Sequence, residues 1–448
     1  MSLPGFTVDV DHNPYLPAGG RDVSAIVTVT ASSPGETAAA AAPPAAPGGR
    51  AEVIMIDCSG SMDSPRTKMT EARAATSAAI DVLDDGVYFA VIQGTSLARH
   101  VYPPDGTMAV AGPRTRDEAK RAVAGLRANG GTAMGVWLRL ARQVFATAPA
   151  TLRHAILLTD GKNQHETPAQ LDEAVALCEG YFSADCRGIG TDWHVGEVRR
   201  ISTGLLGTVD IVPDPAGLAA DFEDMMRGAM SKHLPDVMLR VWTPQQATVR
   251  FVKQVAPAIE DLTGRRAEAG PRAGDYPTGA WAPGESRDYH VGVDVPPADL
   301  GQEMLAARIS LVATAPSGPG GPGSPGPADA EVLGQGLVRA TWTDDEVLST
   351  RISAGVAHYT GQADLASAIA DGLAARQRGD SDEATARLGK AVRLAHEAGH
   401  EDTAKLLSKV VDVVDEATGT VRLKKKVDAA DEMALDTRSV KTVRVKKG

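Results

Sequence analysis

Aromatic residues are scarce in this chain of 448 residues, at 4%, whereas alanine is abundant. We therefore expect cores built from aliphatic side chains. Cysteine is rarer still: Cys58, Cys178 and Cys186 are too few for a disulfide framework, and no C-x-x-C spacing indicates a zinc site. Reduced thiols are the expectation, and an oxidisable Cys58 between polar residues is the alternative.

An excess of positive charge is also missing. The net charge is -11, which argues against a nucleic-acid-binding body, because phosphate binding requires clustered Lys and Arg. No segment approaches the roughly 20 apolar residues of a membrane span, and the first residues lack the basic and apolar regions of a signal peptide. These features favour a cytoplasmic protein whose partner is neither nucleic acid nor a membrane.

Alternating strand and helix signals fill residues 50–232. Helical periodicity separates the apolar strands, which we predict at 52–57, 87–94, 153–159, 184–189 and 208–212. Strands joined by helical crossovers form a mostly parallel sheet with helices on both faces. The segment therefore predicts a doubly wound, Rossmann-like α/β domain.

The pattern changes to short period-2 strands in residues 233–350, which contain a Pro/Gly-rich loop near 315–328 that we expect to be disordered. Residues 1–49 hold similar strands, followed by an Ala/Pro linker. Because these early strands have no partners of their own, we expect them to complete an antiparallel β-sandwich. The α/β domain would then be inserted between the parts of the sandwich.

Helical periodicity returns in residues 358–417, as three segments separated by Gly-containing turns. This arrangement is similar to a tetratricopeptide-type array of three helices. Residues 418–448 are basic and lack a clear apolar face, so we expect a flexible tail. The whole chain is thus predicted to be multi-domain, with α/β, β and α parts.

Oxygen-bearing side chains stand at three element ends of the α/β domain. Asp57, Ser59 and Ser61 follow the strand 52–57, Asp160 follows the strand 153–159, and Thr132 opens a predicted helix in "NGGTAMG". The carboxyl ends of parallel strands share one edge of a sheet, so these side chains should meet there. Hydroxyl and carboxylate oxygens suit hard cations and do not by themselves decide among Mg²⁺, Mn²⁺ and Ca²⁺, of which Mg²⁺ is our expectation.

The motifs D-x-S-G-S-M, G-G-T and T-D-G, in this order, resemble the metal-ion-dependent adhesion site of the von Willebrand factor type A family. The resemblance implies that Ser59 and Ser61 bind the metal directly and Thr132 directly or through water. Asp57 and Asp160 would act through water or as second-shell acceptors. A cation held by neutral hydroxyls keeps positive charge for an Asp or Glu of a partner protein. The resemblance thus implies a non-enzymatic adaptor, in stress-response, tellurium-resistance-like or kinase-linked signalling assemblies.

Other interpretations of the same residues remain open. Ser59 and Ser61 could simply cap a helix in a scaffold with an empty site. A metal-dependent hydrolase is the enzymatic alternative, although no His or Lys in these motifs serves as an obvious base. "HEAGH", residues 396–400, matches the H-E-x-x-H pattern of zinc proteases, but Gly399 places His400 at a helix end.

Two threonines of the basic tail have an aliphatic residue three positions later. Thr437 precedes Val440 and Thr442 precedes Val445, with basic residues nearby. A phosphothreonine in this context resembles ligands of forkhead-associated (FHA) domains, so both are candidate phosphosites for a Ser/Thr kinase. A purely solubilising basic tail is the alternative.

Overall fold

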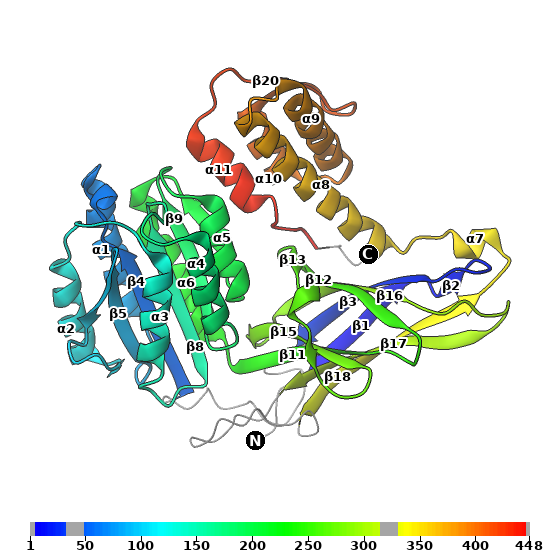
Figure 1. Ribbon diagram of the computed structural model, residues 1–448, viewed down its shortest axis with the longest axis horizontal. Helices are drawn as coiled ribbons and strands as arrows, with labels where there is room; N and C mark the ends of the chain where they lie inside the picture. The colour runs from blue at the N-terminus through cyan, green and yellow to red at the C-terminus, as the bar shows by residue number, and fades with distance from the viewer. Residues whose placement is uncertain (1–4, 33–48, 314–329, 445–448) are drawn as a thin grey trace. The chain divides into compact units, whose positions relative to one another are not determined.

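The structure, a computed structural model, describes residues 5–32, 49–313 and 330–444 (Figure 1). The Ala/Pro linker and the loop near 315–328 lie outside these residues. The chain divides into two compact units. Unit 1 comprises Met1–Ala41, Asp236–Thr278 and Pro283–Gly448, and unit 2 comprises Ala42–Pro235 and Gly279–Ala282. Unit 1 is therefore built from segments on both sides of unit 2 in the sequence.

Unit 2 contains a sheet of strand order β10-β9-β8-β4-β5-β6, with β7 also paired to β5. Its strands are β4 (Arg50–Asp57), β5 (Tyr88–Gly94), β6 (Ala98–Tyr102), β7 (Ala109–Val110), β8 (Leu152–Thr159), β9 (Ser183–Ile189) and β10 (Val209–Val212). The pairings β10–β9, β9–β8, β8–β4 and β4–β5 are parallel, and β6 and β7 are antiparallel. The predicted α/β fold is confirmed, and β6 and β7 are additions at its edge.

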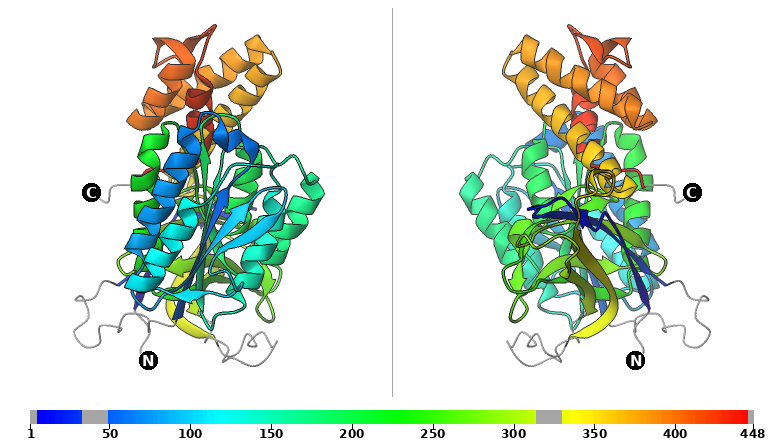
Figure 2. Two further views of the ribbon diagram at one scale, coloured as in Figure 1. Left: turned by 90° about the vertical axis from the view of Figure 1, so that its left-hand side faces the viewer. Right: turned by 90° about the vertical axis from the view of Figure 1, so that its right-hand side faces the viewer.

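Helices lie on both faces of this sheet (Figure 2, left). They are α1 (Thr67–Val82), α2 (Pro113–Ala124), α3 (Met134–Phe145), α4 (Pro168–Cys178), α5 (Val195–Gly204) and α6 (Leu218–Ser231). Ile54 and Ile56, alternate residues of β4, lie in one buried cluster with Ala72 and Ala75 of α1 and Phe222 of α6. Small alanines allow α1 to pack closely against the sheet and α6, so the end of β4 and the start of α1 are held by the core.

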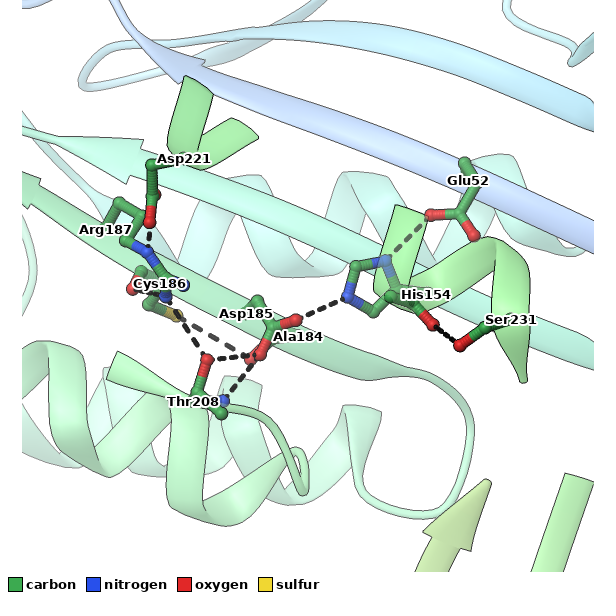
Figure 3. Close-up of polar contacts among 10 residues, drawn as sticks. Glu52, His154, Ala184, Asp185, Cys186, Arg187, Thr208, Asp221 and Ser231 are labelled. Carbon is green, nitrogen blue, oxygen red and sulfur yellow. Dashed lines mark hydrogen bonds and ion pairs between the residues drawn. The ribbon is translucent and has the colours of Figure 1, made fainter. Parts of the chain in front are cut away.

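A buried polar group spans the amino-terminal halves of three adjacent strands (Figure 3). His154 Nδ1 lies 2.8 Å from Glu52 Oε2, and His154 Nε2 lies 3.0 Å from Asp185 Oδ2. Burial alone would lower the pKa of His154, but the charge of Glu52 and the hydrogen bonds to both carboxylates raise it to about 10. The imidazole is therefore charged in the folded protein. It compensates two acids inside the sheet.

Apart from a two-stranded hairpin near the C-terminus, two larger sheets lie mainly in unit 1. One has the order β1-β3-β16-β12-β13, and the other has the order β14-β15-β11-β17-β18-β2. Their strands are β1 (Phe6–His12), β2 (Tyr15–Leu16), β3 (Asp22–Ala31), β11 (Leu234–Trp242), β12 (Thr248–Ala256), β13 (Glu260–Asp261), β14 (Ala267–Glu268), β15 (Ala273–Trp281), β16 (Ser286–Asp294), β17 (Glu303–Ala313) and β18 (Glu331–Trp342). β3 pairs antiparallel with β16 from Asp22↔Asp294 to Thr30↔Ser286. The early strands thus find partners that follow unit 2 in the sequence.

Helices occupy most of the C-terminal part of unit 1: α7 (Glu346–Ser349), α8 (Ala354–Gln377), α9 (Ser381–Glu397), α10 (Glu401–Val410) and α11 (Ala429–Arg438). The predicted third helix, which was expected to reach residue 417, ends at Val410. The next residues form the hairpin of β19 (Val411–Asp415) and β20 (Thr420–Leu423). The β-branched run in "VVDVVD" favours a strand, and Gly419, at φ +69°, permits the turn.

The prediction of a flexible tail from residue 418 is wrong for the described residues up to 444. Val421 of β20 and Leu435 of α11 lie in the same buried cluster as Leu388 and Leu407 of the preceding helices. The apolar residues of this segment are few among its lysines, so no amphipathic face is visible in its sequence. They are nevertheless enough to bury the hairpin and α11 against the helical array.

The segment after α11 also has fixed partners. We call residues 440–444 the C-terminal strap. Ile259 N donates to Val440 O (2.8 Å) and Thr442 N donates to Pro257 O (3.0 Å), beside the end of β12. Arg444 forms an ion pair of 2.6 Å with Asp288 of β16. The strap therefore joins the first sheet of unit 1.

Candidate metal centre

The turn after β4 is organised by its own side chains. Asp57 Oδ1 accepts a hydrogen bond from Ser59 N (2.7 Å), and Asp57 Oδ2 accepts one from Thr159 Oγ1 of β8 (2.6 Å). All eight residues of β4 are buried, and Asp57 is 0% exposed. An extended, fully buried strand thus delivers Asp57 to the carboxyl edge of the sheet, where it fixes the direction of the turn.

Ser59 and Ser61 present their hydroxyls to the same space. Their Oγ atoms lie 3.0 Å apart, and Ser61 Oγ donates to Asp160 Oδ1 (2.7 Å). Ser59 stands at the N-cap of the 3-10 turn Gly60–Asp63, but its side chain makes no capping hydrogen bond. The capping interpretation therefore does not account for Ser59. The motif instead joins the ends of two adjacent strands, β4 and β8.

The loop that carries Thr132 is tied to both strand ends. Gly60 N donates to Gly130 O (2.9 Å), and the Thr132 carbonyl accepts from Gln164 N and His165 N (both 3.1 Å). A Cβ atom at Gly161 would lie 3.0 Å from Thr132 Oγ1, 3.5 Å from Ser61 Oγ and 3.6 Å from Asp57 Oδ2. The structure thus brings together all five side chains that the sequence singled out, around a position without a side chain.

The start of α3 is held by residues that the motif reading missed. Met134 N donates to Asn163 Oδ1 (3.0 Å), and Gly135 N donates to Glu166 Oε1 (2.5 Å). Asn163 Nδ2 in turn donates to Glu166 Oε1 (2.8 Å). These two side chains satisfy N–H groups that a helix start leaves without partners, and so they fix Thr132 relative to Asp160.

A lysine was also missed. Lys68 Nζ donates to Asp160 Oδ2 at 2.7 Å and lies 3.3 Å from Asp192 Oδ2. Its side chain is 5% exposed. One signal was present in the sequence: Lys68 shares the buried helix face of Ala72, Ala75 and Ala79, where a charged residue is unexpected.

Burial decides the ionisation of the neighbouring groups. Burial raises the pKa of Asp57 to about 6, although the hydrogen bonds from Thr159 and Ser59 act against this rise. Burial also raises the pKa of the Cys58 thiol to about 12. Because Cys58 is 0% exposed and protonated, the oxidisable-thiol interpretation is not supported.

The donor set fits a hard divalent cation. Two buried carboxylates lie among three hydroxyls, and the space beside Gly161 is one that a Cβ would enter. In the part of the chain that the structure describes, no group of three or more His, Cys, Asp or Glu side chains is placed to hold a metal ion. A cation would therefore depend on the hydroxyl oxygens of Ser59, Ser61 and Thr132, as suits Mg²⁺ or Mn²⁺.

The zinc-protease interpretation of residues 396–400 fails on geometry. His396 lies in the last turn of α9 and its side chain is 51% exposed. His400 precedes α10, is 6% exposed and lies beside His358. Gly399 adopts φ +66° between them. The two imidazoles are therefore not one turn apart on a single helix, as the zinc motif requires.

The two candidate phosphosites differ in their surroundings. Thr437 is 0% exposed, and its hydroxyl donates to Met433 O (2.8 Å) within α11. The expectation that Thr437 lies in an accessible tail is therefore wrong. Thr442, in the C-terminal strap, is partly exposed and donates to Val255 O (2.6 Å).

None of the helices in residues 5–32, 49–313 and 330–444 is long and apolar enough to cross a membrane.

Known proteins resemble this chain over its whole length. Residues 53–162 match the family model of the von Willebrand factor type A domain, and residues 393–439 match that of the von Willebrand factor type A C-terminal domain. A solved von Willebrand factor type A structure from Catenulispora acidiphila is 52% identical, with a TM-score of 0.90 over 99% of this chain and 98% of that chain.

A more distant structure shares the fold. The ArnB paralog VWA2 from Sulfolobus acidocaldarius is 12% identical, with a TM-score of 0.56 over 97% of this chain and 98% of that chain. Comparison with curated proteins finds no match.

Proposed function

The chain belongs to the von Willebrand factor type A family, and from this premise we propose that it is a non-enzymatic, metal-dependent adaptor that binds an acidic side chain of a partner protein. Domains of this family commonly mediate metal-dependent protein interactions. The observation that carries the proposal is the gathering of three hydroxyls and two buried carboxylates at the carboxyl edge of the sheet.

Each side chain of the centre has a defined task in this proposal. Ser59, Ser61 and Thr132 would hold the cation through neutral oxygens. Asp57 orients the turn through Ser59 N, and Asp160 accepts from the Ser61 hydroxyl, so both carboxylates position the donors. A bound divalent cation supplies a positive charge that neutral ligands do not cancel. A carboxylate of a partner is the group that this charge attracts.

The cation part of the proposal is tested by calorimetric titration with Mn²⁺ or Mg²⁺. The wild type should bind about one equivalent, and Ser59→Ala should weaken binding at least about tenfold, because one direct ligand is lost. Ser64→Ala is the matched control, since Ser64 is exposed in the same turn. Equal affinities for all three proteins would overturn the metal assignment.

The partner part is tested by affinity capture with the purified full chain. Proteins retained by the wild type in Mg²⁺ should be lost with EDTA and with Asp57→Ala, and they should be retained by Lys162→Ala, an exposed substitution near the same edge. Retention by Asp57→Ala in EDTA would show that binding does not use the centre.

We also propose that the adaptor serves a stress-response, tellurium-resistance-like or kinase-linked assembly, which family association alone supports. A Ser/Thr kinase or an FHA-domain protein would act at Thr442 rather than at the buried Thr437. Phosphopeptide mapping after co-expression with a Ser/Thr kinase should place phosphate on Thr442 and not on Thr437. Phosphate on neither residue would remove this link.

The proposal also includes a cellular location and an arrangement of the two larger sheets. A cytoplasmic location is supported by the three cysteines, which are all free and buried. An antiparallel sandwich, formed by two sheets and interrupted in sequence by unit 2, is supported by the β3–β16 pairing. It is also supported by Gly336 of β18, where a Cβ would lie 2.6 Å from Val10 and 3.1 Å from Val8 of β1.

A further inference from the structure

Lys68 is a protein cation inside the candidate centre. Its ammonium group lies 2.7 Å from Asp160 Oδ2, while the other oxygen of the same carboxylate accepts from the Ser61 hydroxyl. Both oxygens of Asp160 are therefore engaged by the chain itself. Lys68 is 5% exposed and Asp160 is fully buried, so solvent screens their attraction little.

We propose that Lys68 sets the cation affinity of the centre by neutralising Asp160, so that a divalent cation is held weakly and keeps more of its charge for a partner's carboxylate. This inference rests on the proposed function of the centre. Lys68 acts here as a positioning and charge-setting residue, since it touches Asp160 and is not itself a candidate ligand.

Charge balance carries the first step. The buried carboxylates of Asp57 and Asp160 would together offer two negative charges to a cation bound by the hydroxyls. With Lys68 beside Asp160, the buried groups of the centre sum to about one negative charge. Attraction between charges a few ångströms apart is strong where water is excluded, so the loss of one charge changes cation affinity substantially.

The position of Lys68 carries the second step. Lys68 lies on the face of α1 that buries Ala72, Ala75 and Ala79, where an aliphatic residue would pack without the cost of burying a charge. Buried ion pairs contribute little net stability compared with well-packed apolar residues. Fold stability is therefore a weak reason for a lysine here, and an effect on the centre is a stronger one.

Asp192 gives the third step, because it shares the same ammonium group. It lies 3.3 Å from Lys68 Nζ in the loop after β9 and is 70% exposed. The lysine chain passes Gly190, where a Cβ would lie 3.2 Å from Lys68 Cε. Because Lys68 pairs with Asp192 as well, its ammonium group neutralises Asp160 less completely. A change that moves Asp192 would therefore alter how far Lys68 neutralises Asp160, and with it the cation affinity of the centre.

The test is calorimetric titration of the full chain with Mn²⁺, after thermal melting without metal has established that each variant is folded. Lys68→Met should bind Mn²⁺ at least about tenfold more tightly than the wild type. Lys68→Arg, which keeps the charge, and Lys162→Met, which removes an exposed charge nearby, should stay within about threefold of the wild type.

Unchanged or weaker binding by a folded Lys68→Met would overturn the inference and leave the proposed function standing. Tight binding by Lys68→Arg would also overturn it, because charge would then not be the cause. Mn²⁺ binding by none of the proteins would overturn both the inference and the proposed function.

A second comparison does not require a change in the core. Asp192→Asn leaves the lysine charge to Asp160 alone and should weaken Mn²⁺ binding about threefold or more. Asp63→Asn is the matched control, since Asp63 is similarly exposed, at 62%, and does not pair with Lys68. If Asp192→Asn has no larger effect than Asp63→Asn, Asp192 does not share the lysine charge and the inference fails.

Discussion

His154 shows how one residue makes the stability of unit 2 depend on pH. The pKa of His154 is raised from its usual value of 6.5 to about 10 by the charge of Glu52 and the bonds to both acids, against the effect of burial. A raised pKa contributes stability that is fully present below pH 6.5 and is lost as the pH rises through 10. From these two pKa values, we expect the free energy of unfolding to fall by about 3–4 kcal/mol between pH 7 and pH 10.

Urea unfolding of the wild type and of His154→Gln across this range checks the expectation. The variant should be less stable at pH 7 and should lose less on going to pH 10. His194→Gln, an exposed histidine of the same unit, should follow the wild-type slope. Parallel slopes for wild type and His154→Gln would contradict the assignment.

A side chain at position 94 is excluded because the ring of Trp137 packs directly against Gly94. A Cβ at this position would lie 2.4 Å from the buried ring of Trp137, whose Nε1 donates to Thr95 O (2.6 Å). We expect Gly94→Ala to cost about 1–3 kcal/mol of unfolding free energy and to weaken Mn²⁺ binding, because α3 carries the Thr132 loop.

Thermal melting and Mn²⁺ titration measure both effects of Gly94→Ala. Gly228→Ala is the control: Gly228 lies in α6 with nothing within 4 Å of the added Cβ, so that variant should gain about 0.5–1 kcal/mol. A Gly94→Ala protein as stable as the wild type would show that the ring can move aside.

Residue types and spacing were enough to single out Asp57, Ser59 and Asp160, because each stands where a strand ends. They were not enough for Lys68 or Glu166. The position of Lys68 on the alanine face of α1 indicates that it is buried, but its contact with Asp160 depends on how α1 packs. The partners of a buried charge are set by tertiary packing, which periodicity along one element does not encode.

At the scale of elements, strands and helices with strong periodicity were predictable to within a few residues. The exceptions include β6, β15, β19, β20 and α11, in which apolar residues are few or are interrupted by glycine, proline or charged residues. Such segments acquire their structure from a partner. The strand β19 exists because β20 pairs with it and because α8 to α10 bury its apolar side.

Leu435 tests whether α11 belongs to the helical core. The side chain is 0% exposed, so Leu435→Ala should lower the unfolding free energy of unit 1 by about 2–5 kcal/mol. Val414→Ala, at a position that is 56% exposed in β19, should change it by less than about 0.5 kcal/mol. Chemical denaturation measures the unfolding free energy of both variants. Equal effects would show that α11 is only loosely attached to the helical core.

For the whole molecule, the decisive feature is that unit 1 is closed by pairing between distant segments. We expect a chain beginning at residue 49 to lose the cooperative unfolding of unit 1, because β16 loses its β3 partner. The strands of unit 2 pair among themselves, so Mn²⁺ binding should persist. Calorimetric melting and titration of the shortened chain report on the two units, and loss of both transitions would contradict this independence.

The strap and the first strands have a mechanical consequence. Residues near both extremities of the described chain, β1 at one and the strap at the other, are bonded to the same sheet of unit 1. A pulling force applied at residues 5 and 444 is therefore resisted first by hydrogen bonds of that sheet. Unit 2 carries no tension until those bonds rupture, so a load on the chain ends would leave the candidate centre undistorted.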